Sequence, residues 1–456
     1  MDVSSRRSAI AATVALITIS IAACASAAAP SASPSKPAVA ASAQPVAAAA
    51  ATPATDGIPS ATLLLRMTGG SDWQMVEAET GRSIFAIPAG TPSDDWHRLV
   101  SVTDAGAETV VTDSPPEPGL GGPELRIPGR WRLPTLGTDP RPVGRSTDGS
   151  TIVLVEAAEA SSKAAAAATS RFAIVEHRSD GHLSTVGDAD LALARVVELR
   201  GTFDYDTMSP DGRILYVVEH LDADRGGHYQ VRAIDVPTGV MRDAVIVDKA
   251  NPDERMAGYP IAQVRRTDGG VFTLYDGPEH PFIHALQSRE AWALCIDLPA
   301  GAATHRTGWG LTASVDQTSL FAVNASAGVA VDVDPSQYAV RRWAELSTAA
   351  APAIRLAKFG HTDVGAVGRT VVLAPDGSRL LAASPTGITV LSTADLHEIR
   401  RDLAGVAVAS VGLVPDGSLG FALTDDGRVV AFDPATGHVL GDVGGGPWAE
   451  LVAVAP

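Results

Sequence analysis

Residues 208–218 read Met-Ser-Pro-Asp-Gly-Arg-Ile-Leu-Tyr-Val-Val, a turn sequence followed by a run of side chains that favour β-structure. The Asp-Gly pair provides a residue that can adopt a positive φ angle between two strands. Residues 231–239, Val-Arg-Ala-Ile-Asp-Val-Pro-Thr-Gly, then form a further alternating stretch that ends in a second turn. This segment therefore predicts consecutive antiparallel hairpins.

The same unit recurs along the chain. Residues 373–381 read Leu-Ala-Pro-Asp-Gly-Ser-Arg-Leu-Leu, and residues 413–418 read Leu-Val-Pro-Asp-Gly-Ser. Weaker copies turn at Asp148–Gly149, Asp268–Gly269 and Asp316–Gln317. Strands such as residues 429–432, Val-Val-Ala-Phe, are apolar on both faces, so each sheet must be covered by a neighbour on either side. We therefore predict an all-β fold in which four-stranded sheets stack around an axis, a β-propeller.

The spacing of the turns sets the number of blades. The six turns from 148 to 416 lie about 54 residues apart on average, so residues 61–456 accommodate about seven units. Eight blades are the alternative, because residues 88–136 hold no clear copy of the unit. The terminal run 448–455 reads as an inner strand, and residues 61–66 read as the strand that should follow it. We expect these two strands to pair and close the ring, which removes a free sheet edge.

The Pro-Asp-Gly turn with its following strand, and the Val-x-Asp-x-x-Thr-Gly hairpin, resemble the YVTN-type bacterial β-propeller repeat. The resemblance covers most of residues 61–456 and implies a family that includes lactonase-like enzymes, quinoprotein-like enzymes and many surface proteins of unassigned role. These motifs specify blades and not activities. The chain contains no Trp-Asp dipeptide, so it does not resemble a typical WD40 protein.

The first residues follow the order of a secretory signal. Arg6 and Arg7 precede an apolar stretch that is too short for a comfortable membrane span of ~20 residues. The stretch ends in Ile-Ala-Ala before Cys24, which resembles the bacterial lipobox. We therefore expect residues 1–23 to be a lipoprotein signal peptide and Cys24 to carry the lipid that anchors the exported protein to the cell membrane.

The next segment, residues 24–60, is almost entirely Ala, Pro and Ser. Such a composition has little to bury, so we expect a disordered tether between the anchor and the propeller at 61–456. The formal net charge is −17, which repels phosphate backbones and argues against a nucleic-acid partner. We expect a monomer whose partner is an unidentified protein, peptide or glycan.

The most suggestive polar segment is residues 275–284, Tyr-Asp-Gly-Pro-Glu-His-Pro-Phe-Ile-His. Its Asp276, Glu279, His280 and His284 are residue types that bind ligands or work as acids and bases, and they are the candidate ligand contacts. A polar surface loop is the competing interpretation, since the Pro and Gly residues preclude a helical face. Cys295 lies in an apolar strand-like run and is expected to be a core residue.

No nucleophile elbow, phosphate-binding loop, dinucleotide fingerprint or zinc-protease motif occurs in the chain, so no cofactor is expected. Two hypotheses remain open. The first is a non-catalytic binding or scaffold propeller. The second is a hydrolase or lactonase-like enzyme, which requires acidic and His side chains to converge on one mouth of the channel.

Overall fold

A computed structural model describes residues 57–93, 96–116, 119–136, 139–157, 169–178, 190–222, 227–252, 255–299, 308–347 and 369–455. The expected signal peptide, the lipidated Cys24 and nearly all of the expected tether lie outside these residues. The described residues are strands, turns and connections. Within them, no helix is long and apolar enough to cross a membrane.

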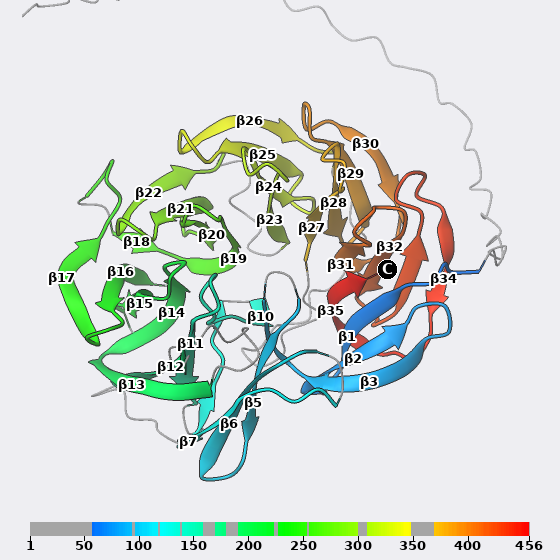
Figure 1. Cartoon of the computed structure of the whole chain (residues 1–456). Helices are drawn as coiled ribbons and strands as arrows, with labels where there is room; N and C mark the ends of the chain where they lie inside the picture. Colours follow the sequence, from blue (N-terminus) through cyan, green and yellow to red (C-terminus); the bar gives the residue numbers. More distant parts are fainter. Residues whose placement is uncertain are drawn as a thin grey trace, which may run out of the picture. The chain divides into compact units, whose positions relative to one another are not determined.

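The described strands form eight blades, the larger of the two numbers that the sequence left open. Seven are four-stranded antiparallel sheets, and blade 4 carries a fifth short strand. Figure 1 shows the blades arranged around a central axis, with the later strands of each blade towards the outside. The all-β propeller predicted from the repeat is confirmed.

Blades 1 to 4 consist, from inner to outer strand, of β35 (Trp448–Ala455), β1 (Thr62–Met67), β2 (Asp72–Glu77) and β3 (Arg82–Pro88); β4 (Gly90–Pro92), β5 (Leu99–Asp104), β6 (Glu108–Ser114) and β7 (Glu124–Pro128); β8 (Trp131–Arg132), β11 (Thr151–Glu156), β12 (Thr169–Arg178) and β13 (Asp190–Arg200); and β14 (Thr202–Met208), β15 (Ile214–His220), β16 (His228–Asp235) and β17 (Val240–Ile246). The additional strand of blade 4, β18 (Met256–Ala257), pairs with β16.

Blades 5 to 8 consist, in the same order, of β19 (Tyr259–Arg265), β20 (Gly270–Asp276), β21 (Phe282–Gln287) and β22 (Trp292–Asp297); β23 (Trp309–Ala313), β24 (Leu320–Asn324), β25 (Val329–Asp334) and β26 (Ala339–Glu345); β27 (Val371–Leu373), β28 (Arg379–Ser384), β29 (Gly387–Ser392) and β30 (Glu398–Asp402); and β31 (Val408–Leu413), β32 (Gly420–Thr424), β33 (Val429–Phe432) and β34 (Val439–Val443). Two short strands, β9 (Thr135–Leu136) and β10 (Asp139–Pro142), form a separate hairpin.

The first and last strands share blade 1, as predicted. β35 pairs antiparallel with β1, so that Thr62 lies opposite Ala455 and Met67 lies opposite Trp448. Arg66 adds an ion pair to the buried carboxylate of Glu450, with 2.8 Å between its Nε and the Oε2 atom. The edge that β1 would otherwise expose is therefore covered by the other end of the chain.

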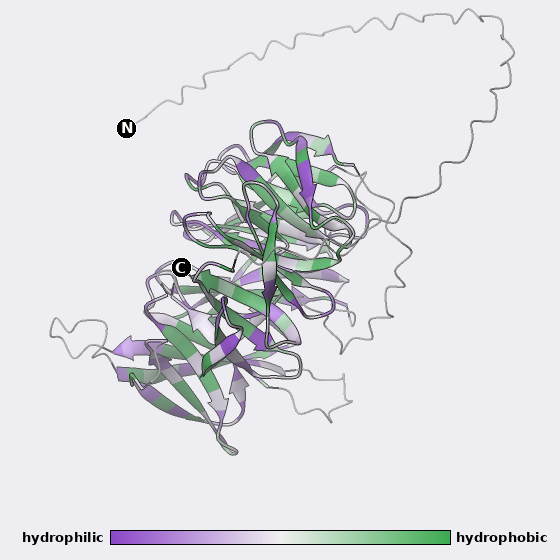
Figure 2. Ribbon diagram, turned by 90° about the vertical axis from the view of Figure 1, so that its right-hand side faces the viewer, coloured by the Kyte–Doolittle hydropathy of each residue, from purple (hydrophilic) through white to green (hydrophobic). Residues whose placement is uncertain are grey.

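The apolar core is divided among the blade interfaces. Eight hydrophobic clusters are present in the described residues, and each one fills the space between two neighbouring blades. The middle strands are buried on both faces; all five residues of β24, for example, are buried. Figure 2 shows the hydrophobic residues gathered along the strands. A single blade cannot cover its own two faces, so the blades are stable only when they are stacked.

The turns between first and second strands have the predicted geometry. The residue after Asp has a positive φ at all six positions, including 71° at Gly377 and 58° at Gln317, where a glutamine stands in place of glycine. The Asp carboxylate accepts a hydrogen bond from the backbone N–H two residues later. In one example, the N–H of Ser378 donates to Oδ1 of Asp376 at 2.9 Å. The repeat is therefore set by local turn chemistry.

The region without a clear repeat, residues 88–136, holds blade 2 and the start of blade 3. The inner strand of blade 2, β4, has only three residues, and β8 has two. The β9–β10 hairpin interrupts the inner strand of blade 3 after β8. Pairing with β11 continues beyond the hairpin at Arg145, which forms a β-bridge with Ile152. Because these inner strands are short and interrupted, the repeat pattern in the sequence does not reveal blade 2, and the number of blades counted from that pattern is one too low.

Candidate functional site

The two ends of the channel are distinguished by their turns. Each turn between the inner strand and the second strand lies at one end, which we call the turn face. Because neighbouring strands are antiparallel, the hairpin between the second and third strands lies at the other end, the opposite face. The six Asp turns and the segment between β4 and β5 therefore belong to the turn face, and the β20–β21 hairpin belongs to the opposite face.

A cavity of about 540 Å³ occupies the channel near the turn face, and we call it the channel cavity. Inner strands from five blades line it: residues 262–264 of β19, 311–313 of β23, 371–373 of β27, 411–413 of β31 and 451–454 of β35. Turn-face residues Val315, Pro375 and Pro415 complete its rim. The volume lies within the range of about 300–1,000 Å³ that is usual for small-molecule and side-chain pockets.

The β9–β10 hairpin limits the cavity on its remaining side. The hairpin lies near β4, β14 and β19, the inner strands of blades 2, 4 and 5. Figure 1 shows β10 inside the ring. Thr91 of β4 ties the base of the insertion in place by donating its hydroxyl to the carbonyl of Val143 at 3.0 Å. The channel is therefore partly filled from blade 3, and the cavity lies along blades 5 to 8 and blade 1.

Most residues that line the channel cavity are Val, Leu, Ala and Pro, although polar atoms form more of its surface than apolar atoms do. The exposed residues at the rim include Trp96 at 38% and Val315 at 75% exposure. Its charged lining residues are Arg141 of β10 and Arg369, which precedes β27. Among the described residues that line the cavity, none is Asp, Glu or His. The apolar side chains and the polar atoms of the lining together favour a ligand that offers both kinds of group.

A buried acid lies directly behind the cavity wall. Gln263 lines the cavity, and its amide Nε2 donates to the hydroxyl of Thr273 at 3.0 Å and, more weakly, to the carboxylate of Asp206 at 3.4 Å. Asp206 itself is only 1% exposed. Burial raises the pKa of Asp206 to about 7, although the charge of Arg265 opposes the change. This carboxyl therefore titrates near neutral pH within the wall between blades 4 and 5.

The structure places Asp276, Glu279 and His280 away from the channel cavity. They lie at the end of β20 and in the hairpin to β21, on the opposite face. Glu279 is exposed, and Asp276 and His280 are half-buried. His280 approaches Asp297 of β22, with 3.9 Å between Nε2 and Oδ1.

His284 is separated from the other three candidates because it lies inside β21, away from the hairpin. It lies within β21, fully buried between blades 4 and 5, and its ring meets Tyr275 edge-on with centroids 6.3 Å apart. Burial lowers the pKa of His284 to about 4, against the charge of Asp248. A neutral, buried imidazole cannot reach a ligand at either mouth, so the four residues do not form one contact surface.

The described residues contain no cluster of His, Cys, Asp and Glu side chains that could form a metal centre. Cys295 lies on β22 beside the buried cluster between blades 4 and 5, as expected for a packing residue. No three His, Cys, Asp or Glu side chains of the described ranges gather in a way that could hold a metal ion. The expected lipid attachment at Cys24 lies outside the described part of the chain.

No protein-family model matches this chain, and no curated protein matches it. Similar solved structures include apo AztD from Citrobacter koseri, with 11% identity, a TM-score of 0.50 and coverage of 87% of this chain and 97% of that one. The periplasmic gluconolactonase PpgL of Pseudomonas aeruginosa has 15% identity, a TM-score of 0.43 and coverage of 86% and 97%. Sqt1 of Saccharomyces cerevisiae has 10% identity, a TM-score of 0.47 and coverage of 79% and 85%. The similarity to AztD supports the propeller fold alone.

Proposed function

We propose that this protein is a membrane-tethered, extracytoplasmic binding module whose ligand enters the channel cavity from the turn face. The observation that carries the proposal is the cavity itself: inner strands of five blades enclose about 540 Å³ behind a rim that exposes the apolar side chains of Trp96 and Val315. Exposed apolar groups around a concave site are the usual mark of a binding surface.

The chemistry of the lining favours a peptide segment of a partner protein over a glycan. Among the lining residues of β23, β27 and β31, only Thr312 has a polar side chain. Apolar side chains of a peptide fit these strands, whereas a glycan would find few side-chain hydrogen-bond partners on them.

The location rests on the amino-terminal sequence. Residues 1–23 would direct export, and the lipid on Cys24 would hold the propeller at the outer side of a cell membrane through residues 25–60. Two or three acyl chains anchor a protein stably, whereas one chain holds only weakly.

The experiment is a selection of random peptides displayed on phage against the full-length protein, followed by affinity measurements on the selected peptides. We expect enrichment of peptides that carry apolar residues. Replacement of Ala262, which lines the cavity, by Trp should fill the space and weaken binding by about tenfold or more. Replacement of the exposed Val240 on the outer strand β17 by Trp adds the same bulk elsewhere and should leave affinity unchanged.

Two outcomes would contradict the proposal. Equal affinity for the Ala262→Trp and Val240→Trp variants would place the binding surface outside the channel. Hydrolysis of a sugar lactone by the wild-type protein, lost in Ala262→Trp and kept in Val240→Trp, would support the hydrolase alternative instead.

A further inference from the structure

The channel cavity is bordered by the edges of inner strands, so main-chain groups contribute to its polar surface. Polar atoms form more of that surface than apolar atoms do, although Thr312 is the one residue with a polar side chain among the lining residues of β23, β27 and β31. Each of these strands pairs with the second strand of its own blade and with no other strand of the described sheets. Figure 1 shows them at the inner ends of their blades. Their other edge, which we call the inner edge, faces the channel.

The register of β23 shows which of its residues turn their backbone groups towards the channel. β23 pairs with β24 without a register shift, and the N–H of Ser314, directly after β23, donates to the carbonyl of Ser319 at 2.9 Å. Hydrogen-bonded and non-hydrogen-bonded pairs alternate along an antiparallel ladder. Thr312 therefore bonds to β24. The N–H and C=O groups of Leu311 and Ala313 point away from β24, along the inner edge.

The backbone groups of Leu311 and Ala313 are available to a ligand. Both residues are half-buried and line the channel cavity. Within the part of the chain that the structure describes, no hydrogen bond uses their N–H or C=O groups. Alternate residues of a strand lie about 6.6–6.8 Å apart. Two donors and two acceptors at this spacing match one edge of an extended peptide.

The other lining strands are less suited to pair with a further strand. The pairing of β19, β31 and β35 with their neighbours contains register shifts, so their inner edges are irregular. In β31, the N–H of Val411 also donates to the carbonyl of Arg369 at 3.0 Å. β27 is regular, but its Val371 and Val372 are only 4% and 8% exposed. β23 therefore offers the accessible, regular inner edge among the five strands.

A glycine marks the point at which the inner edge of β23 opens. Gly310 directly precedes Leu311, and a Cβ atom placed on it would come within 2.4 Å of Oγ1 of Thr370 and 2.6 Å of Cγ2 of Val371. β23 and the start of blade 7 are therefore in close contact at Gly310. The open part of the edge runs from Leu311 towards the rim at Val315, where the cavity meets the turn face.

We propose that the ligand of the channel cavity is an extended peptide segment that adds as a further strand to the inner edge of β23. The inference rests on the proposed function, because it specifies how a peptide would bind in the same cavity. The main chain of the segment would accept from the N–H groups of Leu311 and Ala313 and donate to their carbonyls. An antiparallel orientation is expected, since antiparallel pairs are slightly more stable. Main-chain bonds supply affinity in such complexes, and alternate side chains supply specificity.

Methylation of a peptide's amides tests this geometry on the wild-type protein. The probe is acetyl-Val-Thr-Val-Thr-Val-amide, and isothermal titration of the full-length protein measures its affinity. Only alternate N–H groups of an added strand face β23. N-methylation of the first, third and fifth residues, or of the second and fourth, therefore separates the two sets. We expect one of these peptides to lose about tenfold or more in affinity and the other to stay within about twofold of the probe.

A proline variant tests the same bonds from the side of the protein. Ala313→Pro removes an N–H that faces the channel and leaves the ladder to β24 intact, so β23 should tolerate it. We expect it to bind the probe about fivefold or more weakly. The matched control is Glu345→Pro on the outer strand of the same blade. The N–H of Leu346 donates to the carbonyl of Gly328 at 2.8 Å, so the N–H of Glu345 points away from β25. This control should bind the probe as the wild type does.

Several results would overturn the inference. They are the absence of saturable binding of the probe, equal affinities of the two methylated peptides, and equal affinities of the folded Ala313→Pro and Glu345→Pro variants. Thermal melts establish that both variants fold, and the methylated peptides decide the question alone if Ala313→Pro does not. The proposed function is tested separately. Selected peptides that lose affinity in Ala262→Trp would still support a ligand in the channel cavity, even if strand addition to β23 were wrong.

Discussion

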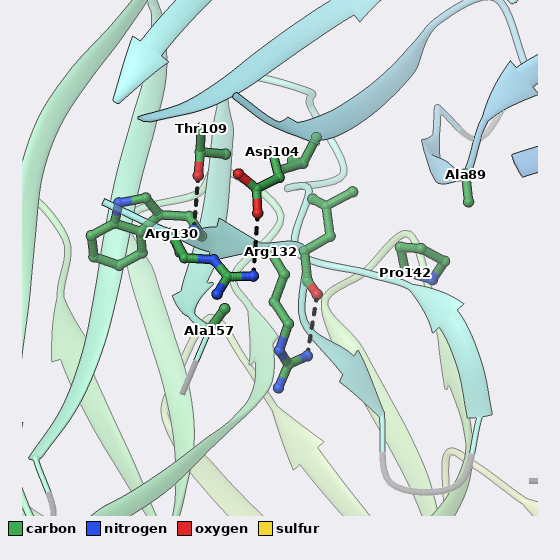
Figure 3. A pocket seen from close by; sticks show the side chains of 10 residues that line it. Ala89, Asp104, Thr109, Arg130, Arg132, Pro142 and Ala157 are labelled. Carbon is green, nitrogen blue, oxygen red and sulfur yellow. Dashed lines mark hydrogen bonds and ion pairs between the residues drawn. The ribbon is translucent and has the colours of Figure 1, made fainter. Parts of the chain in front are cut away.

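Arg141 and Pro142 are neighbours on β10, yet they line different cavities: Arg141 lines the channel cavity, and Pro142 lines a second cavity between blades 2 and 3 (Figure 3). Successive residues of a strand point to opposite sides, so the β9–β10 hairpin acts as a partition between the two spaces. The insertion that breaks the inner edge of blade 3 is therefore also the element that shapes both cavities.

Closure of the ring predicts a large effect at its last inner strand. Trp448 is 3% exposed and packs in the cluster between blades 8 and 1, so Trp448→Ala should lower the free energy of unfolding by about 3–5 kcal/mol. Trp343 on the outer strand β26 is 49% exposed, and Trp343→Ala should cost under about 1 kcal/mol. Urea denaturation measures both. Similar losses for the two variants would argue against a closure that depends on β35.

The turn geometry predicts opposite effects at two equivalent positions. Gly377 has a φ of 71° and open space where a Cβ atom would lie, so Gly377→Ala should cost about 1 kcal/mol through backbone strain alone. Gln317 occupies the same place in its turn with a φ of 58°, so Gln317→Gly should be neutral or stabilising by a few tenths of a kcal/mol. Thermal melting decides, and a destabilised Gln317→Gly variant would contradict this explanation of the turn.

The buried carboxyl of Asp206 predicts a pH dependence of stability. Its pKa is raised to about 7 in the folded protein, whereas an unfolded Asp titrates near 3.9. The folded state holds the proton more tightly, so stability should fall as the pH rises from about 4 to 7. Asp206→Asn should match the wild type at pH 4 and exceed its stability at pH 8 by up to about 4 kcal/mol.

Denaturation at a series of pH values measures this difference. The control is Asp243→Asn on β17, an exposed position at which the change should stay within about 0.5 kcal/mol at every pH. If Asp206→Asn were less stable than the wild type at pH 8, the folded protein would favour the charged form of Asp206, and the inference would be wrong.

The proposed anchor predicts a change of compartment in a single variant. In a bacterial host, the wild-type protein should incorporate labelled fatty acid and sediment with membranes, because two or more acyl chains bind stably. Cys24→Ala should lose the label and appear in the soluble fraction. Cys295→Ala removes the other cysteine of the chain and should retain the label. Labelling that persists in Cys24→Ala would refute the anchor.

The sequence predicted those features of the fold that depend on local chemistry. Asp211–Gly212 and its copies specify turns, and the apolar strands between them require sheets on both sides. The eighth blade was uncertain because β4 and β8 are too short to carry the pattern. The channel cavity could not be predicted from sequence at all, since it joins residues as distant as Trp96 and Val454, whose proximity depends on closure of the ring.

The candidate ligand contacts illustrate the same limit. His284 follows His280 by only four residues, but β21 carries it into the buried interface while His280 stays in the hairpin. Knowledge of the strand register, which pairs His284 with Thr273 and Cys295, would have shown that it faces a neighbouring blade. Proximity in sequence was therefore a poor guide to a shared site.

Occupation of the channel cavity by a ligand at the turn face is the central claim. Amide hydrogen exchange of the full-length protein, with and without a selected peptide, tests it most directly. We expect slower exchange in the turns at 314–319, 374–378 and 414–418, which surround the cavity, and unchanged exchange at 277–281. Protection confined to 277–281, or to the outer strands of the blades, would contradict it.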